Sequence, residues 1–266
     1  MSCNRKVFVP SSGEASSAAE ALQEQASASD IMHHLNQAAA RNVFVDGGDV
    51  LQVGGEMYVG LSERSSPQGA AYLAAAFAGQ PGVSQVAALP VAHLHQQQGS
   101  LHLKSLATCV GNDTLAVPDS EVRAARPLAP LPHHPPCHPL QIGQQLLDTL
   151  LQFSQKYSAW ESAVPGAELQ RSHHTARGGA LLHVLPIPAS EWAASNAVLA
   201  NGTLIVRSKE ECPLAFALYE QYVATVGAAR GVHQLLSVPA SQVALVDGAL
   251  TCSSIILHDD QQEGKA

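Results

Sequence analysis

The sequence lacks the features of two broad classes of protein. It has no run or stripe of basic residues, and its 14 Lys and Arg against 22 Asp and Glu give a formal charge of −8. A protein that follows a nucleic-acid backbone needs such a stripe, so we expect no nucleic-acid partner. No stretch reaches the ~18 apolar residues of a membrane span, and the first residues have no apolar signal-peptide core. We therefore expect a cytoplasmic protein with no membrane partner.

The sequence also lacks a cysteine framework. It has an odd number of cysteines, five, widely spaced and without a CxxC pair. This spacing does not indicate disulfides or a zinc site. The segment PHHPPCH at 132–138 holds metal-ligand residue types, but its prolines favour an irregular loop. We therefore expect no metal and no cofactor. Hydrophobic residues make up 46% of the chain, which is enough for one sizeable core or two small ones.

Three hairpin signals recur along the chain. They lie at 49–60, 106–117 and 196–206, and they turn at Gly54-Gly55, Gly111-Asn112 and Asn201-Gly202. In each case β-branched or apolar residues flank residues that accept a positive φ. The sequence therefore predicts three pairs of antiparallel strands.

Each hairpin is followed by a helical pattern and then by a strand-like run. Helical spacing occurs at 70–77, 142–151 and 214–226, and the runs lie at 83–89, 180–187 and 232–238. Ser66 and Pro67 are typical of the first helix start. Ser208 and Glu211 have capping-box spacing for the third helix, although Pro213 favours a start at that residue, and Gly227 is expected to end it. A last strand is predicted at 250–257.

This repetition predicts an α+β fold built as a propeller-like array of strand–strand–helix–strand units, rather than a doubly wound sheet. The middle unit is enlarged by residues 121–175, which we expect to be an irregular Pro- and His-rich surface insertion.

Three residue types of catalytic interest lie at the starts of such units. Asp46 belongs to DGGD, His102 to LHLKS and Cys252 to LTCSS. Equivalent unit starts converge near the axis of a pseudo-symmetric array, so we expect these side chains to meet. A cysteine, a histidine and a carboxylate form a nucleophile, a base and a group that orients the base. The alternatives are a small buried Cys252, a structural His102 and an Asp46 that serves only its turn.

Four stretches resemble the dimethylarginine dimethylaminohydrolase family of the arginine deiminase (pentein) superfamily: VDGGDVL, YVGLSERS, LHLKS and VDGALTCSSIIL, in the same order. The resemblance implies five ββαβ units around a pseudo-fivefold axis, of which about three and a half are expected here. The family's acidic FVED-type motif has no counterpart in residues 1–41, which implies a divergent or N-terminally truncated segment. Residues 42–258 would form the amidinohydrolase domain and 259–266 a polar tail.

The resemblance also implies roles for single residues. Cys252 resembles the family's nucleophile, His102 its general acid and base, and Asp46 the carboxylate that orients the histidine. Substrate-binding positions are implied for Arg64, which would bind the substrate α-carboxylate, and for Val246 and Asp247. A solvated Arg64 before a helix is the alternative for that residue.

The implied reaction is hydrolysis of N-methylated arginine to citrulline and methylamine or dimethylamine through a covalent thiouronium on Cys252. The alternatives are an arginine deiminase-like enzyme, or an inactive truncated homologue that binds a cationic amino acid. The expected partner is a small-molecule substrate, and the sequence leaves the oligomeric state open.

Overall fold

The computed structural model describes residues 6–7, 42–92, 94, 102–119, 139–162, 180–246 and 248–255. Several sequence predictions lie outside these residues: the PHHPPCH segment, Asp247 and the tail at 259–266. The same holds for nearly all of residues 1–41, of which only the two-residue strand β1 (Lys6–Val7) is described before Asn42.

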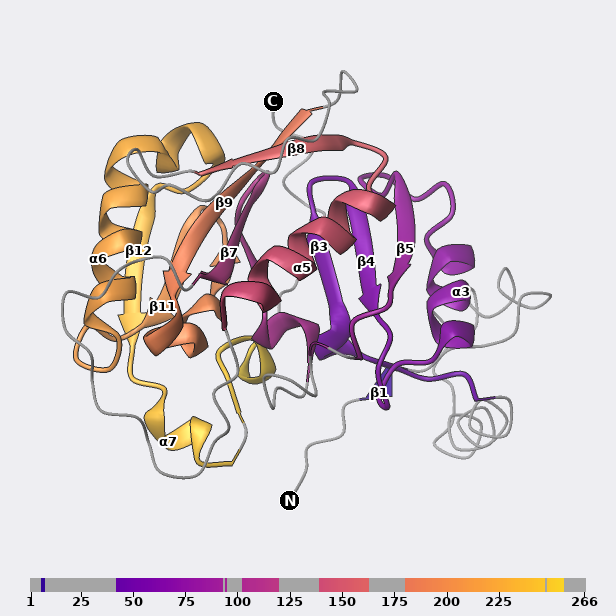
Figure 1. The fold of residues 1–266 in the computed structure, drawn as a ribbon, viewed down its shortest axis with the longest axis horizontal. Helices are drawn as coiled ribbons and strands as arrows, with labels where there is room; N and C mark the ends of the chain where they lie inside the picture. Colours follow the sequence, from indigo (N-terminus) through magenta and orange to yellow (C-terminus); the bar gives the residue numbers. More distant parts are fainter. Residues whose placement is uncertain are drawn as a thin grey trace.

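Three units of the same topology make up most of the described fold (Figure 1). In each unit the first and second strands pair antiparallel, and the second and third strands pair parallel. The units are β3 (Val50–Val53), β4 (Glu56–Gly60), α3 (Pro67–Ala76) and β5 (Gln85–Leu89); β6 (Thr108–Gly111), β7 (Thr114–Asp119), α5 (Pro139–Phe153) and β9 (Ala180–Pro188); and β10 (Val198–Ala200), β11 (Thr203–Arg207), α6 (Pro213–Tyr222) and β12 (Gln234–Val238). The predicted strand–strand–helix–strand repeat is thus confirmed in all three places.

The middle unit carries a fourth strand. β8 (Tyr157–Ser162) pairs parallel with β9, which gives the sheet order β6-β7-β9-β8. α5 confirms the helical pattern predicted at 142–151, whereas β8 contradicts the expectation of an irregular insertion for residues 157–162. Leu146, Leu147 and Leu150 of α5 are fully buried, so this helix is part of the core.

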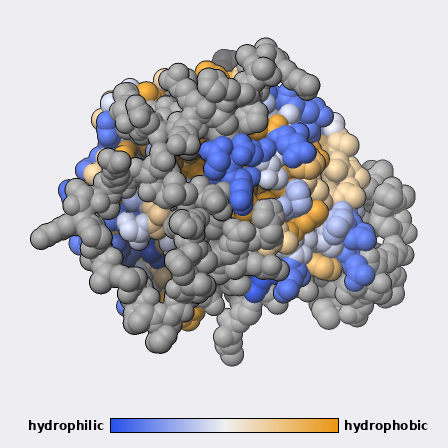
Figure 2. Space-filling view, in the orientation of Figure 1, coloured by the Kyte–Doolittle hydropathy of each residue, from blue (hydrophilic) through white to orange (hydrophobic). Residues whose placement is uncertain are grey.

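Neighbouring units share their hydrophobic cores. One cluster joins side chains of the first unit, such as Leu51 and Tyr58, with Leu115 and Leu147 of the second. A second cluster joins the second and third units and includes Tyr219 and Tyr222 of α6. The result is an α+β fold of several small sheets packed through side chains. Figure 2 shows hydrophilic and hydrophobic residues interspersed over the described part of one face.

Local signals at turns and helix starts are mostly confirmed. Asn201 and Gly202 have φ values of 50° and 72°, the positive values that a tight hairpin turn requires. Ser66 caps α3 by accepting a hydrogen bond from the backbone N–H of Gly69, with Pro67 at the first helical position.

The third helix corrects two predictions. α6 begins at Pro213 as expected, but Cys212 is its N-cap and the capping box does not form. Glu211 instead accepts hydrogen bonds from the backbone N–H groups of Ala240 and Ser241, because these unpaired donors begin the next short helix, α7 (Ser241–Ala244). The end at Gly227 is also wrong. A π-turn, η4 (Val223–Gly227), and a 3₁₀ turn, η5 (Ala228–Arg230), extend the helical path to Gly231, whose φ of 77° ends it.

A short 3₁₀ helix lies close before the first strand of each unit. These are η1 (Gly47–Asp49), which follows β2 (Val45–Asp46), η2 (Leu103–Ser105) and η3 (Ala189–Ser195). A fourth, η6 (Thr251–Ser253), lies where the last strand was predicted. That prediction is wrong within the described residues, since Leu250 has helical φ and ψ of −60° and −45°. The apolar residues of LTCSSIIL fit a strand, but tertiary hydrogen bonds to this segment select a turn.

Candidate active site

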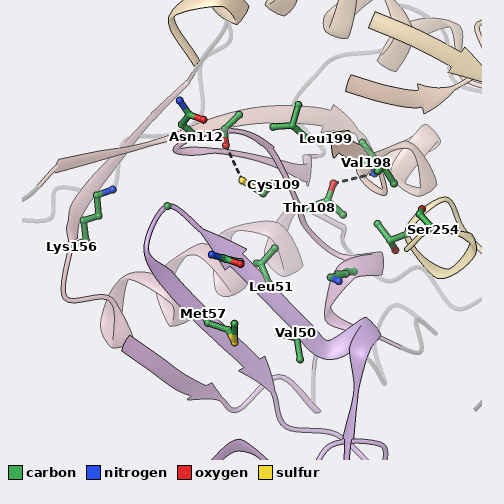
Figure 3. Close-up of a pocket in the computed structure, with 16 residues that line it drawn as sticks. Val50, Leu51, Met57, Thr108, Cys109, Asn112, Lys156, Val198, Leu199 and Ser254 are labelled. Atoms are coloured by element: carbon green, nitrogen blue, oxygen red, sulfur yellow. Dashed lines mark hydrogen bonds between the residues drawn. The ribbon is translucent and has the colours of Figure 1, made fainter. Parts of the chain in front are cut away.

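The first strands of the three units come together in the middle of the fold. β6 contacts β3 on one side and β10 on the other. A cavity of about 810 Å³ opens between them, lined by Val50 and Leu51 of β3, Thr108 and Cys109 of β6, and Val198 and Leu199 of β10 (Figure 3). Thr251 and Ser254, on either side of Cys252, line the same cavity, as does Lys104. The first strands of the three units therefore line one cavity, together with residues next to Cys252.

His102 and Asp46 form a close pair. Nε2 of His102 lies 3.1 Å from Oδ2 of Asp46, and each side chain is only 12% exposed. Among the described residues, Nε2 makes no hydrogen bond of good geometry, so the pair is a close electrostatic contact. The pairing joins two segments 56 positions apart in the sequence, which was the spatial arrangement predicted for them.

Gly48 makes this pairing possible. A Cβ atom at residue 48 would lie 2.5 Å from Cγ of His102 and 2.7 Å from its Cδ2, far inside the ~3.5–4.0 Å of a normal carbon contact. The DGGD turn thus lets the imidazole ring lie directly against its backbone. Asp46 shapes the same turn, since its Oδ1 accepts a hydrogen bond from the backbone N–H of Gly48 at 3.0 Å.

The Asp46 carboxylate is stabilised in its charged form. Burial alone would raise its pKa, but His102, the backbone N–H of Gly48 and the positive charge of Arg64 together outweigh burial and lower the pKa below its ordinary value. Nη1 of Arg64 lies 4.0 Å from Oδ2 of Asp46, and its side chain is 32% exposed. The structure therefore brings Arg64 to the predicted pair, with its guanidinium partly open to solvent.

Asp49 is a structural carboxylate that anchors the same turn. Its side chain is fully buried, and Oδ1 accepts a hydrogen bond from the backbone N–H of Leu103, the residue after His102. Oδ2 accepts from the hydroxyls of Ser62 and Ser65 at 2.7 and 2.8 Å. Asp49 thus fixes the backbone that carries His102, and its hydrogen bond to Leu103 connects the first unit to the second.

Cys252 lies on η6 and is exposed. Its turn is tied to the histidine segment through Asn196, whose Nδ2 donates to the backbone carbonyl of Lys104 and to Oγ1 of Thr251, both at 2.9 Å. Oδ1 of Asn196 accepts from the backbone N–H of Thr251 at 3.0 Å. The residues next to Cys252 and the residues next to His102 are therefore linked by a single side chain.

The Lys104 side chain interacts electrostatically with the thiol of Cys252 and with the carboxylates of Asp46 and Asp49. Burial lowers the pKa of Lys104, while the charges of Cys252, Asp46 and Asp49 act in the opposite direction and do not fully compensate. A lysine held among a thiol and two carboxylates places positive charge where a thiolate would form.

The two remaining binding positions are less well defined. Val246 lies on the turn after α7 and is 75% exposed, and its backbone N–H donates to the carbonyl of Val243. Asp247 lies outside the described residues.

No group of three or more His, Cys, Asp or Glu side chains among the described residues could hold a metal ion. No helix in the same part of the chain is long and apolar enough to cross a membrane.

Sequence reasoning missed Asn196, Lys104 and Thr251. Lys104 lies within the LHLKS motif and Thr251 precedes Cys252, so their places beside the motif residues were the available signal. For Asn196 the sequence offered no signal beyond its position directly after η3 and just before the first strand of the third unit.

Comparison with known proteins supports the resemblance seen in the sequence. Residues 24–131 match the arginine deiminase family model, a segment that includes Asp46, Arg64 and His102. A dimethylarginine dimethylaminohydrolase of Streptomyces coelicolor is 34% identical over 102 residues, which cover 37% of this chain and 36% of that protein.

Solved structures similar to this chain include dimethylarginine dimethylaminohydrolase from Pseudomonas aeruginosa, at 16% identity with a TM-score of 0.41, covering 78% of this chain and 53% of that one. They also include the putative arginine deiminase from Porphyromonas gingivalis, at 14% identity with a TM-score of 0.45, covering 82% and 61% of the two chains. The matches thus span between about one third and three fifths of the length of these relatives.

Proposed function

We propose that this chain, which is related to the arginine deiminase superfamily, carries the catalytic centre of an amidine hydrolase that acts on N-methylated arginine. The observation that carries the proposal is the pair of His102 and Asp46, 3.1 Å apart and held by the DGGD turn. The second support is the tie through Asn196, which anchors the turn of Cys252 to the backbone beside that pair. Together they supply a nucleophile, a base and an orienting carboxylate.

In the proposed first step the Cys252 thiolate adds to the central carbon of the substrate guanidinium. The resonance of that group makes it a poor electrophile, so the stronger nucleophilicity of a thiolate over a thiol is needed. The C–N bond to methylamine or dimethylamine then breaks, and His102 donates the proton that the leaving amine requires. Asp46 keeps the imidazole in place.

In the second step water attacks the covalent thiouronium that remains on Cys252. His102 accepts one proton of this water, the released amine takes up the other, the C–S bond breaks, and citrulline leaves with the new oxygen. The thiolate is thereby regenerated. Arg64, with a partly exposed guanidinium 4.0 Å from Asp46, is the proposed partner of the substrate α-carboxylate.

The experiment is an assay of citrulline release from dimethylarginine by the full chain and by Cys252→Ser. Cys212→Ser is the matched control, because Cys212 is buried at the start of α6 and takes no part in the site. We expect Cys252→Ser to abolish release and to prevent a covalent adduct detectable by mass spectrometry, while Cys212→Ser retains both. Equal release from the wild type and Cys252→Ser would refute the proposal.

A second candidate, hydrolysis of unmethylated arginine, is favoured by the match to the arginine deiminase family model. The same assay with arginine in place of dimethylarginine separates the two, since ammonia is then released in place of the methylated amine. Substrate binding without release, at the same affinity in Cys252→Ser, would instead support a protein that only binds a cationic amino acid.

A further inference from the structure

We propose that Asn196 is a positioning residue that holds the turn of Cys252 against the turn of His102. The inference rests on the proposed function for the chemistry of these two residues, and on the geometry of Asn196 for the rest. Nothing in the motifs that carry the family resemblance includes this residue.

The Asn196 side chain has all the partners that its position requires. It is only 4% exposed, its Nδ2 donates to the Lys104 carbonyl and to the Thr251 hydroxyl, and its Oδ1 accepts from the Thr251 backbone. The asparagine side chain combines two N–H donors and one carbonyl acceptor, and all three are used here. A buried amide with its bonds satisfied in this way fixes the relative position of the segments it joins.

Asn196 is itself held rigidly by the residues on either side. Ser195 donates from its hydroxyl to the carbonyl of Ser105, at 3.2 Å, and accepts at its own carbonyl from the Thr108 hydroxyl, at 2.5 Å. The backbone N–H of Ala197 returns a bond to the Thr108 hydroxyl at 3.1 Å. The backbone around Asn196 is thus fixed to η2 and β6, the segments that follow His102.

The turn of Cys252 depends on Asn196 more than on any other side chain. Among the described residues, every hydrogen bond that joins residues 249–255 to another part of the fold ends on Asn196, while the remaining ones are local. Removal of the amide would therefore release η6 from the rest of the site. Reacting groups must lie within ~3–3.5 Å of one another, and a 1 Å displacement can cost about a hundredfold in rate.

The released turn would also move Cys252 relative to Lys104, whose backbone carbonyl accepts from Asn196 and whose side chain lines the same cavity as Thr251. A nearby cation stabilises a thiolate, which is the reactive form of cysteine. A Cys252 that moves away from Lys104 should therefore react more slowly. A substitution that merely loosened the fold would leave Cys252 as reactive as in the wild type, or more so.

The test is the rate at which iodoacetamide alkylates Cys252, followed by peptide mass mapping between pH 6 and pH 10, in the full chain and in Asn196→Ala. We expect the variant to react at least about fivefold more slowly at pH 7. Asp113→Asn is the matched control. It removes the 2.7 Å ion pair with Arg230, another tie between the second and third units, at the opposite end of β6.

Thr251→Val provides a second variant, because it removes one of the three bonds to Asn196 and retains the shape of the side chain. It should slow alkylation at pH 7 by a smaller factor, and the double variant should be no slower than Asn196→Ala, since both changes act on one connection. If Asn196→Ala does not fold, a wild-type rate in Thr251→Val overturns the proposal.

The proposed role of Asn196 would also be overturned by a wild-type alkylation profile in Asn196→Ala. The same holds if Asp113→Asn slows alkylation as much as Asn196→Ala does. These results are independent of the proposed hydrolysis, because alkylation needs no substrate. Citrulline release that survives Cys252→Ser removes the proposed function, whereas an unchanged alkylation profile removes only the role of Asn196. Where release is measurable, Asn196→Ala should lower kcat at least about tenfold with little change in KM.

Discussion

The buried carboxylate of Glu56 provides a direct test of how the first two units are joined. Glu56 begins β4 in the first unit and is fully buried, yet Oε1 accepts hydrogen bonds from the backbone N–H groups of Gln155 and Lys156 in the second unit, at 2.8 and 2.9 Å. It also accepts from Nε2 of Gln85 at 3.0 Å. These two backbone N–H groups and the Gln85 amide are all hydrogen-bond donors, so residue 56 must provide an acceptor at the position of Oε1.

Oε2 has different partners. It accepts from the hydroxyls of Tyr58 and Ser154, both at 2.6 Å. A hydroxyl can rotate and accept instead of donating. In Glu56→Gln the amide oxygen can therefore take the place of Oε1, and the amide nitrogen can donate to the Tyr58 hydroxyl. Ser154 loses its acceptor, because its hydroxyl already accepts from the backbone N–H groups of Lys156 and Tyr157. Since hydrogen bonds to charged groups contribute ~1.5–3 kcal/mol against ~1 kcal/mol for neutral ones, we expect a cost of about 1–3 kcal/mol.

Glu56→Ala removes the acceptors altogether. Two backbone N–H groups and a side-chain amide then lose their partner at the junction, at ~1–3 kcal/mol for each group that water does not reach. We expect a total of about 3–5 kcal/mol, in the range observed when a buried network is broken. Glu220→Gln, at an exposed position of α6, should stay within about 0.5 kcal/mol of the wild type.

The assay is urea unfolding followed by circular dichroism, with the free energy of unfolding compared at equal m-values. The expected order of stability is wild type, then Glu56→Gln, then Glu56→Ala, with a clear step between the two variants. Equal costs for Gln and Ala, or a cost below about 0.5 kcal/mol for Ala, would refute the assignment of donors and acceptors at this junction.

Three further predictions concern the site itself. Gly48→Ala should destabilise the fold by about 1–3 kcal/mol, because the added methyl group clashes with the His102 ring. It should also lower any citrulline release by more than tenfold. Wild-type stability together with wild-type release would refute the close packing of Gly48 against His102. Because the folded pKa of Asp46 lies below its ordinary value of 3.8, its contribution to stability is present above that pH and is lost as the pH falls through the folded pKa. In acid unfolding curves the advantage of the wild type over Asp46→Asn should therefore shrink below pH 3.8, and a constant difference would contradict the pairing. Burial raises the pKa of Cys109 to about 11, so at pH 8 a disulfide reagent should label the exposed Cys252 well before Cys109, as peptide mapping would show.

The sequence predicted best those features that depend on neighbouring residues alone. The Asn201-Gly202 turn needs two positive φ values, and the Ser66-Pro67 start needs a cap and a fixed φ, so a few residues determine each. The repeated pattern then gave the topology of all three units. The structure also confirms the predicted approach of His102 to Asp46.

Features that depend on distant partners could not be predicted in this way. The segment LTCSSIIL has the apolar pattern of a strand, but Thr251 bonds to an asparagine 55 positions away and the chain turns there. Glu56 was an ordinary strand residue in the sequence, and its donors lie as many as 100 positions further along. Neither connection leaves a local pattern, because each joins side chains to backbone groups of another unit.

The separation of the three sheets has a consequence for how the chain folds and opens. Within the described residues, no backbone ladder passes from one of these sheets to another, so every strand of these three sheets finds its partner inside its own unit. Such a chain resembles a repeat array, in which local elements form early and their interfaces follow. Amide hydrogen exchange should then resolve separate cooperative blocks rather than one global transition. The middle block, which holds α5 and shares a core with both neighbours, should exchange last.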